Sequence, residues 1–186
     1  MSKMSRRPPR PGVSKARIGE ILRVDHAGEY GAVAIYKGQQ AVFSRSPKTR
    51  DIAQQLAHME EEEQKHLDAF DALLVERSVR PTVMTPLWNV AGYGLGVVTA
   101  LMGEKAAHAC TEAVETVIEQ HYGDQVEELK DSEPELSATF AEFREDELAH
   151  RDHAIGEGAK EAIGYPMLSA VITAGCKAAI KITEKI

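Results

Sequence analysis

The stretch EDELAHRDH, residues 145–153, places Glu147 three residues before His150 in a helix-forming context. Residues three apart share one face of a helix, so this pair could present two metal ligands on the same side. Charge runs of this kind usually form a solvated surface, and a single Glu-x-x-His recurs by chance. The stretch therefore decides the fold only if the rest of the chain repeats its pattern.

Four segments of the chain repeat inward-facing side chains at alternating steps of three and four. They cover residues 18–40, 52–73, 108–129 and 136–154. This spacing is typical of helices that bury one face in a bundle. No run of alternating, turn-bounded residues suggests a strand. The sequence therefore predicts an all-α fold, a four-helix bundle within one domain of residues 18–186.

Two short turns divide these helices into pairs. Ser46 before Pro47 is typical of a helix N-cap followed by the first helical position. Ser132-Glu133-Pro134-Glu135 has the form of a capping box. Helices joined by short turns pack as antiparallel neighbours, so we expect two hairpins.

The polar residues that interrupt the four inward faces follow a repeated order. Helix by helix they are Glu29, then Glu63 with His66, then Glu115, then Glu147 with His150. The first two glutamates have their midpoint at position 46 and the last two at position 131, so each midpoint falls at a predicted turn. Residues equidistant from the turn of an antiparallel hairpin lie at the same height. All four carboxylates are therefore expected at one level of the bundle.

Four carboxylates buried together need compensation, because each isolated buried charge costs many kcal/mol. Four Glu and two His are the ligand set of a carboxylate-bridged di-iron or di-manganese centre in a four-helix bundle. Carboxylate and imidazole also suit Fe or Mn better than a thiolate-preferring ion. The sequence therefore predicts these six residues as metal ligands.

Several other polar residues lie near the predicted ligands. Glu62 and Asp146 could hydrogen-bond the ligand imidazoles or be exposed charges. Tyr122 could line the site or be a buried core residue. Glu112 and Glu119 flank the third glutamate without matching the mirrored spacing. The remaining candidates are interpreted mainly as surface or core side chains: His26, His108, His121, His153, Cys110 and Cys176.

The charge distribution separates the first 17 residues from the rest. They contain six of the 22 Lys and Arg and no acid, which leaves 16 basic against 29 acidic residues elsewhere. Such an acidic body argues against nucleic acid as the main partner. The basic, Pro-rich arm of residues 1–17 is expected to be disordered, with contact to anionic lipid or organellar targeting as alternatives. Two cysteines and no secretory signal favour a reducing compartment.

Two charge-free runs lie outside the four predicted helices, at residues 81–103 and 162–176. Pro86, Asn89 and three glycines disfavour a straight membrane-spanning helix in the first run. We expect it to be a partly helical crossover between the hairpins, and the second run to begin a C-terminal helix. Either run could offer apolar surface to a partner or simply cover the bundle.

Five stretches closely resemble the 5-demethoxyubiquinone hydroxylase family of ubiquinone biosynthesis. They are RVDHAGEYGA (23–32), VRPTVMTPLWNVAGYGLG (79–96), ACTEAVETVIEQHY (109–122), FREDELAHRDH (143–153) and AGCKAAI (174–180). The resemblance runs from about residue 18 to the C-terminus. It implies a ferritin-like di-iron monooxygenase at a membrane surface, which hydroxylates the ring of 5-demethoxyubiquinone with O2 and electrons from NADH.

The resemblance also implies roles for particular residues and partners. Each iron would have one pair of terminal ligands, with two glutamates bridging: Glu29 with His66, Glu115 with His150, and Glu63 and Glu147 between the metals. The substrate would be a polyprenyl quinone, and residues 81–103 and about 162–180 would lie on the inner membrane, on its bacterial cytoplasmic or mitochondrial matrix face. A lipid-binding protein of ubiquinone synthesis is an implied partner, and a homo-oligomer is left open. No Gly-rich dinucleotide fingerprint follows a strand, so no NADH site is identified.

Two other functions fit the same bundle less completely. A ferroxidase or iron-storage protein would form a soluble cage and would have no need of the charge-free crossover. A metal-free lipid-binding bundle would hold no iron. The sequence favours the hydroxylase.

Overall fold

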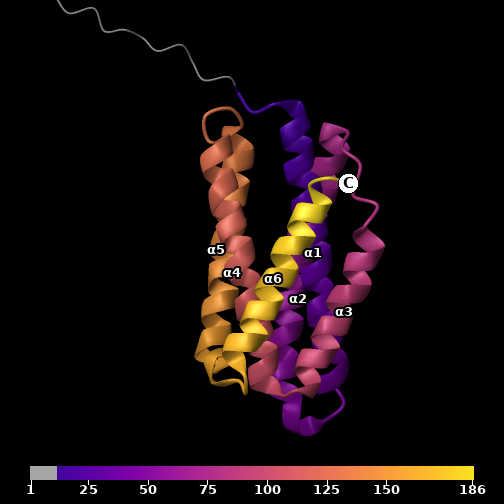
Figure 1. Ribbon diagram of the computed structural model, residues 1–186, viewed down its shortest axis with the longest axis vertical. Helices are drawn as coiled ribbons and strands as arrows, with labels where there is room; N and C mark the ends of the chain where they lie inside the picture. Colours follow the sequence, from indigo (N-terminus) through magenta and orange to yellow (C-terminus); the bar gives the residue numbers. More distant parts are fainter. Residues whose placement is uncertain (1–11) are drawn as a thin grey trace, which may run out of the picture.

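Six long α-helices dominate residues 12–186, which are the residues that the computed structural model describes (Figure 1). They are α1 Lys15–Phe43, α2 Arg50–Arg77, α3 Thr85–Leu101, α4 Glu104–Leu129, α5 Pro134–Gly156 and α6 Tyr165–Thr183, with short 3-10 turns η1 Pro47–Thr49 and η2 Ala159–Glu161. No strand occurs among the described residues, and the predicted all-α class is confirmed. The predicted disordered arm falls largely on residues 1–11, outside the described part. α1 begins three residues before the predicted domain start.

The first hairpin forms where the sequence places it. Ser46 is the N-cap of η1, its hydroxyl accepts a hydrogen bond from the Lys48 backbone N–H, and Pro47 is the first residue of the turn. α2 follows directly and packs along α1. The proline and its cap therefore set the reversal that brings the first two helices together.

The capping box predicted at the second reversal is wrong. Pro134 occupies the first turn of α5, so the N-cap is Glu133, and no side chain caps this helix. Ser132 lies one residue too early, and its hydroxyl instead accepts a hydrogen bond from the Val13 backbone N–H at 3.3 Å. The reversal itself occurs as predicted, and α4 packs along α5.

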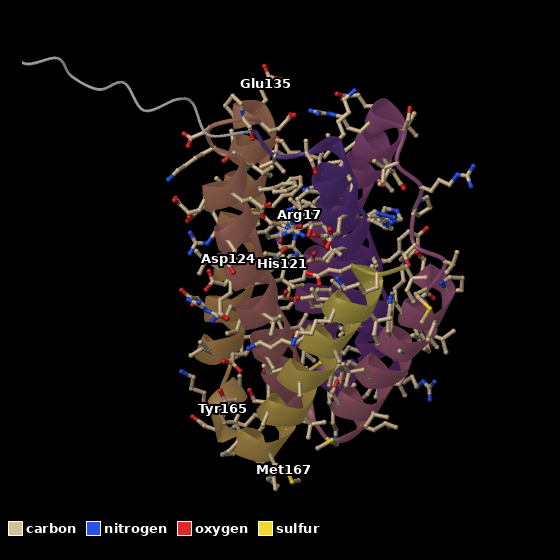
Figure 2. All side chains as sticks on the ribbon, turned by 45° about the horizontal axis from the view of Figure 1, so that its top comes forward. Arg17, His121, Asp124, Glu135, Tyr165 and Met167 are labelled. Carbon is tan, nitrogen blue, oxygen red and sulfur yellow. The ribbon has the colours of Figure 1, made fainter. Side chains whose placement is uncertain are left out.

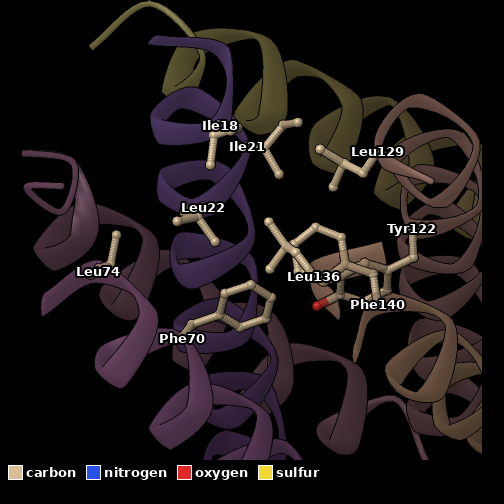
Figure 3. Close-up of a cluster of buried hydrophobic side chains, with 9 residues drawn as sticks. All are labelled: Ile18, Ile21, Leu22, Phe70, Leu74, Tyr122, Leu129, Leu136 and Phe140. Atoms are coloured by element: carbon tan, nitrogen blue, oxygen red, sulfur yellow. The ribbon is translucent and has the colours of Figure 1, made fainter. Parts of the chain in front are cut away.

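Two apolar clusters lie on either side of the level predicted for the ligands. One joins α1, α2, α4 and α5 near the second reversal (Figure 3), through Ile18, Ile21, Leu22, Phe70, Leu74, Tyr122, Leu129, Leu136 and Phe140. The other lies nearer the first reversal and contains Tyr36, Phe43, Ile52, Leu56, Met59, Ala100 and Ala107. Together they hold the four helices in register and shield the level between them from water.

The predicted crossover contains α3, which packs closely against α1 (Figure 1). Glycines allow this approach: a Cβ atom at Gly96 would lie 2.1 Å from the Ile35 carbonyl oxygen, and one at Gly38 would lie 2.3 Å from the Tyr93 carbonyl oxygen. α6, the predicted C-terminal helix, packs mainly against α4. Within residues 12–186, none of the helices combines the length and the apolar character that a membrane crossing requires.

α3 and α6 also expose apolar side chains to solvent. Val90 is 69% exposed on α3, and Met167 is 73% exposed on α6. Other exposed apolar side chains on these two helices are Leu87, Tyr93, Val98, Leu101, Val171 and Ile182. The crossover and the C-terminal helix thus offer apolar surface, as the sequence suggested, as well as covering the bundle.

Candidate metal centre

Four helices bring all six predicted ligands together. Two overlapping groups have potential ligand atoms within 4.8 Å of one another: Glu29, Glu63, His66 and Glu147 form the first, and Glu63, Glu115, Glu147 and His150 the second. All six residues are buried. Glu63 and Glu147 belong to both groups, which is the arrangement required of bridging carboxylates. The mirrored spacing about the two reversals therefore does place the carboxylates at one level.

The inward-facing atoms of this cluster make no hydrogen bond to described groups outside it and face one another: His150 Nδ1 lies 3.0 Å from Glu63 Oε1, and His66 Nδ1 lies 3.4 Å from Glu147 Oε1. Both carboxylate oxygens of Glu63 and of Glu147 are buried in this way, and so is the Nδ1 atom of His66 and of His150. One oxygen of Glu29 and one of Glu115 share this state. Buried polar atoms are nearly always satisfied, so such a concentration points to a bound group. Carboxylate oxygens and imidazole nitrogens in this number suit two Fe or Mn ions.

When no metal is bound, protons on the glutamates and imidazoles offset the negative charge of the cluster. Burial raises the pKa of Glu29 and of Glu115 well above the usual range, and neighbouring carboxylates add to this rise. Burial acts the same way on Glu63, but the imidazoles of His150 and His66 outweigh it and lower its pKa to about 2. Burial alone would lower the pKa of both imidazoles, yet the facing carboxylates raise it to about 11 for His66 and about 12 for His150. Metal ions must therefore displace protons from this site.

The protons bound to the metal-free cluster predict a pH dependence of stability. Folded metal-free protein holds protons on His66 and His150 that the unfolded chain, with imidazole pKa values near 6.5, loses above neutral pH. Stability should therefore fall as the pH rises from 7 to 9, by at most about 1.4 kcal/mol per pH unit for each imidazole. The melting temperature of metal-free protein should decrease over this range, and the gain on anaerobic addition of Fe(II) should increase.

The matched control for this titration is His153→Gln, which changes an exposed imidazole of α5 outside the cluster. Its melting temperature should show the same downward slope with pH. If metal-free wild-type protein became more stable between pH 7 and pH 9, His66 and His150 would not be protonated in the metal-free cluster as described.

The outer nitrogens of both imidazoles bind acids across the bundle. His66 Nε2 on α2 lies 3.1 Å from Asp146 Oδ2 on α5, and His150 Nε2 on α5 lies 3.0 Å from Glu62 Oε2 on α2. The sequence left open whether Glu62 and Asp146 bind the imidazoles or are exposed charges; the structure shows the hydrogen bonds, and each acid binds the imidazole of the opposite helix. This crossed pair turns both Nδ1 atoms toward the cluster, as expected of oriented metal ligands.

Two tyrosines bind the outer glutamates in a reciprocal way. The Tyr122 hydroxyl on α4 donates to Glu29 on α1, and the Tyr36 hydroxyl on α1 donates to Glu115 Oε1 on α4 at 2.8 Å. The sequence suggested that Tyr122 could line the site, but it suggested no role in the site for Tyr36. The spacing Glu-x6-Tyr, repeated in α1 and α4, is the signal that could have identified it.

An apolar cavity of about 430 Å³ runs along the seam between α1 and α4, walled on its other sides by α3 and α6. Its lining includes Gly28 and Ala32, which flank Glu29, and Val114 and Ile118, which flank Glu115. The volume lies in the range of small-molecule sites. The cavity therefore adjoins the backbone that carries the two outer glutamates.

The family model described as "Ubiquinone biosynthesis protein COQ7" matches residues 16–183. The chain belongs to this family. A 3-demethoxyubiquinol 3-hydroxylase of Rhodospirillum rubrum is 49% identical over 92% of this chain and 79% of its own length. The human NADPH-dependent 3-demethoxyubiquinone 3-hydroxylase is 43% identical over 94% of this chain and 80% of its own, and the 5-demethoxyubiquinone hydroxylase of Saccharomyces cerevisiae is 37% identical over 92% and 79%. The family expected from the five sequence stretches is thereby confirmed.

In this member of the COQ7 family, Glu112 and Glu119 have partners outside the cluster. Glu112 accepts a hydrogen bond from the Tyr165 hydroxyl at 3.1 Å, so it ties α4 to the start of α6. Glu119 pairs with Arg144 at 3.2 Å and with Arg151 at 3.7 Å, so it links α4 to α5. Both glutamates therefore connect α4 to its neighbouring helices on either side of Glu115.

The histidines and cysteines set aside by the sequence analysis also stay out of the cluster in this COQ7 family chain. His26 Nε2 lies 3.0 Å from Asp71 Oδ1, and His108 stacks edge-on against His153. Cys110 is fully buried in an apolar cluster, against which Cys176 packs. His121 has a different environment, next to Asp25, and is treated below.

Proposed function

We propose that this chain is a di-iron monooxygenase that hydroxylates the ring of 5-demethoxyubiquinone to give demethylubiquinone. One observation carries the proposal: six ligand-type side chains are buried together, and an apolar cavity is lined by neighbours of two of them, Glu29 and Glu115. The relatives support it, because their names describe hydroxylases of demethoxylated ubiquinones.

Each part of the cluster would have a distinct task. Glu29 with His66 would hold one iron, Glu115 with His150 the other, and Glu63 and Glu147 would bridge them. The iron pair would supply the activation of O2 that organic side chains cannot perform. Asp146 and Glu62 hold the two imidazoles in the orientation that presents Nδ1 inward. The apolar walls of the cavity would keep bulk water from the reacting ring.

The apolar parts of the chain fit a polyprenyl quinone as substrate. The cavity has α3 and α6 as walls, and these helices also carry the exposed apolar side chains. We propose that this surface rests on the inner membrane, at a bacterial cytoplasmic or mitochondrial matrix face, so that the prenyl tail stays in lipid. A lipid-binding protein of ubiquinone synthesis is proposed as a partner on the same surface.

The electron donor is proposed to be a reduced nicotinamide nucleotide. The resemblance pointed to NADH, whereas the names of the human and mouse relatives specify NADPH. Either donor delivers two electrons and one proton as hydride. Both should therefore be supplied, in separate reactions, when the purified protein is assayed.

The test of this function is complementation of a bacterial strain that accumulates demethoxyubiquinone. Expression of the chain should restore ubiquinone, measured by mass spectrometry of extracted quinones. Iron and O2 should both be needed when purified protein converts the quinone in lipid vesicles. Persistent accumulation of demethoxyubiquinone with well-expressed, iron-loaded protein would overturn the proposal. The ferroxidase alternative would then gain weight, although the apolar cavity has no evident use in iron storage.

A further inference from the structure

α1 and α4 carry a similar set of side chains at the same spacings, and two positions in or beside this set differ between the helices. Counting along each helix, α1 has Asp25, Glu29, Tyr36 and Gln39, and α4 has Thr111, Glu115, Tyr122 and Gln125 at identical spacings. The two tyrosine–glutamate hydrogen bonds cross between these sets. The first position is Asp in one set and Thr in the other. The residue before each tyrosine is likewise Ile35 in one and His121 in the other.

These differences make the two ends of the cluster chemically unlike. Near Tyr36 the two differing positions carry Ile35 and Thr111, neither of which can titrate. Near Tyr122 the buried Asp25 carboxylate, 1% exposed, faces the His121 imidazole, which is 22% exposed. The Glu29 end therefore has a polar connection toward the surface.

His121 Nε2 has a hydrogen-bond partner in either protonation state. It lies 3.2 Å from Asp25 Oδ1, to which a protonated ring donates. It also lies 2.8 Å from Gln125 Nε2, from which a neutral ring accepts. Gln125 Nε2 also donates to Asp25 Oδ1 at 2.9 Å, which holds the carboxylate in place. A nitrogen partnered in both states can take up and release a proton with little rearrangement.

The proposed reaction needs such a route. Ring hydroxylation consumes one O2, two electrons and two protons and yields one hydroxyl group and one water. A reduced nicotinamide supplies both electrons and one proton, so the second proton comes from solvent. The six ligand-type side chains are buried, and a ligand imidazole could pass a proton inward only by becoming an imidazolate. The hydrogen bonds of His66 and His150 to surface acids are therefore poor routes.

We propose that His121 and Asp25 take up the solvent proton that hydroxylation consumes and pass it toward the Glu29 end of the cluster. This inference rests on the proposed function. Asp25 Oδ2 is buried without a partner among the described residues, so it can extend the connection inward. Asp25 lies one helical turn before Glu29, and its partner Gln125 lies one turn after Tyr122, so the pair is one turn from the Tyr122–Glu29 hydrogen bond. The route ends at the Tyr122 hydroxyl, one hydrogen bond from Glu29.

The charged groups around His121 raise the pKa of its imidazole on balance. Burial alone would lower its pKa, but Asp25 on α1 raises it, Glu184 beyond the end of α6 adds to the rise, and Arg17 on α1 opposes it. Figure 2 shows Arg17 and His121 at the seam between α1 and α4. Glu128 on α4 binds the Arg17 guanidinium at 3.0 Å and so reduces its opposition.

Titration of His121 tests the pair without any turnover. Proton NMR of protein loaded with diamagnetic zinc should give its pKa, with the resonance assigned by its absence from His121→Gln. Asp25→Asn should lower that pKa by about one pH unit or more. Thr111→Val, at the matching position of the other set, should leave it unchanged. An Asp25→Asn protein, folded by circular dichroism, with an unshifted His121 pKa would overturn the proposal.

Steady-state kinetics then test the route itself. Wild-type kcat should fall as the pH rises through the His121 pKa. His121→Gln should lower kcat by about tenfold or more at neutral pH, remove this limb of the profile and leave KM unchanged. Thr111→Val should keep the wild-type profile. An iron-loaded His121→Gln with wild-type kcat and pH profile would overturn the route alone, whereas a wild-type chain that hydroxylates nothing would overturn the proposed function.

Discussion

Glu147→Ala should abolish quinone hydroxylation and lower the iron content well below two ions per chain. Glu147 belongs to both ligand groups, and both of its oxygens are buried without described partners outside the cluster. Its removal takes one donor from each proposed metal position and leaves two imidazoles beside an incomplete carboxylate set. Loss of partners outside the ligand shell already costs 10–100-fold in metal proteins, so loss of a bridging ligand should lower activity by more than about 100-fold. Activity in lipid vesicles and metal analysis of the same preparation measure both effects.

The matched control is Glu145→Ala, two residues earlier on α5, where the side chain is exposed. This variant removes the same charge from the same helix and should keep wild-type iron and wild-type activity. Circular dichroism should show unchanged helicity in both variants, because Ala is the best helix former. Hydroxylation retained by an iron-poor Glu147→Ala protein would remove the metal centre from the proposed function.

The level of the candidate site was predictable from sequence because it depends on distances along the chain. Two hairpins whose turns fall at the midpoints of paired glutamates can place those glutamates only at one height. Glu29 and Glu63 meet for that reason, whatever the details of the intervening turn. The failed capping box at Ser132 shows this directly: the cap is different, yet Glu115 and Glu147 still meet.

The contacts that cross between helices were less predictable, because they depend on rotation and on side-chain reach. For Asp146 the sequence offered either a hydrogen bond to a ligand imidazole or an exposed charge, and only the structure identifies its partner as His66 of the other hairpin. The sequence suggested no role in the site for Tyr36, since a buried tyrosine and a buried leucine give the same periodic signal. Only the structure shows its hydroxyl reaching Glu115 across the bundle.

The position of α3 could not be predicted from the sequence. The sequence predicted a crossover segment, but not that the helix within it packs against α1. A charge-free composition indicates that a segment can be buried, but it does not identify the element against which the segment packs. The residues that determine how α3 packs are glycines, which in a helix are usually interpreted as destabilising. In α3 they mark the places where its backbone approaches that of α1, and one of these places also lines the cavity, through Gly92 and Gly31.

Gly96→Ala should therefore destabilise the protein although it improves the intrinsic helix propensity of α3. The added Cβ atom would lie 2.1 Å from the Ile35 carbonyl oxygen of α1, which cannot move without its own helix. Overpacking of this kind costs about 1–3 kcal/mol, so the melting temperature should fall by roughly 4–10 °C. Because Leu95 and Trp88 of α3 line the cavity, a displaced α3 should also raise KM for the quinone while the iron content stays at the wild-type value.

Gly94→Ala provides the matched control on the same helix, since a Cβ atom there meets nothing within 4 Å. With propensity as the only change, this variant should be as stable as wild type or more stable, by up to about 1 kcal/mol. The opposite signs expected two residues apart separate backbone contact from helix propensity, and thermal unfolding of the two variants measures the difference. Equal melting temperatures for Gly96→Ala and Gly94→Ala would mean that α3 is not held against α1 by the approach of the two backbones. The wall of the cavity would then need another explanation.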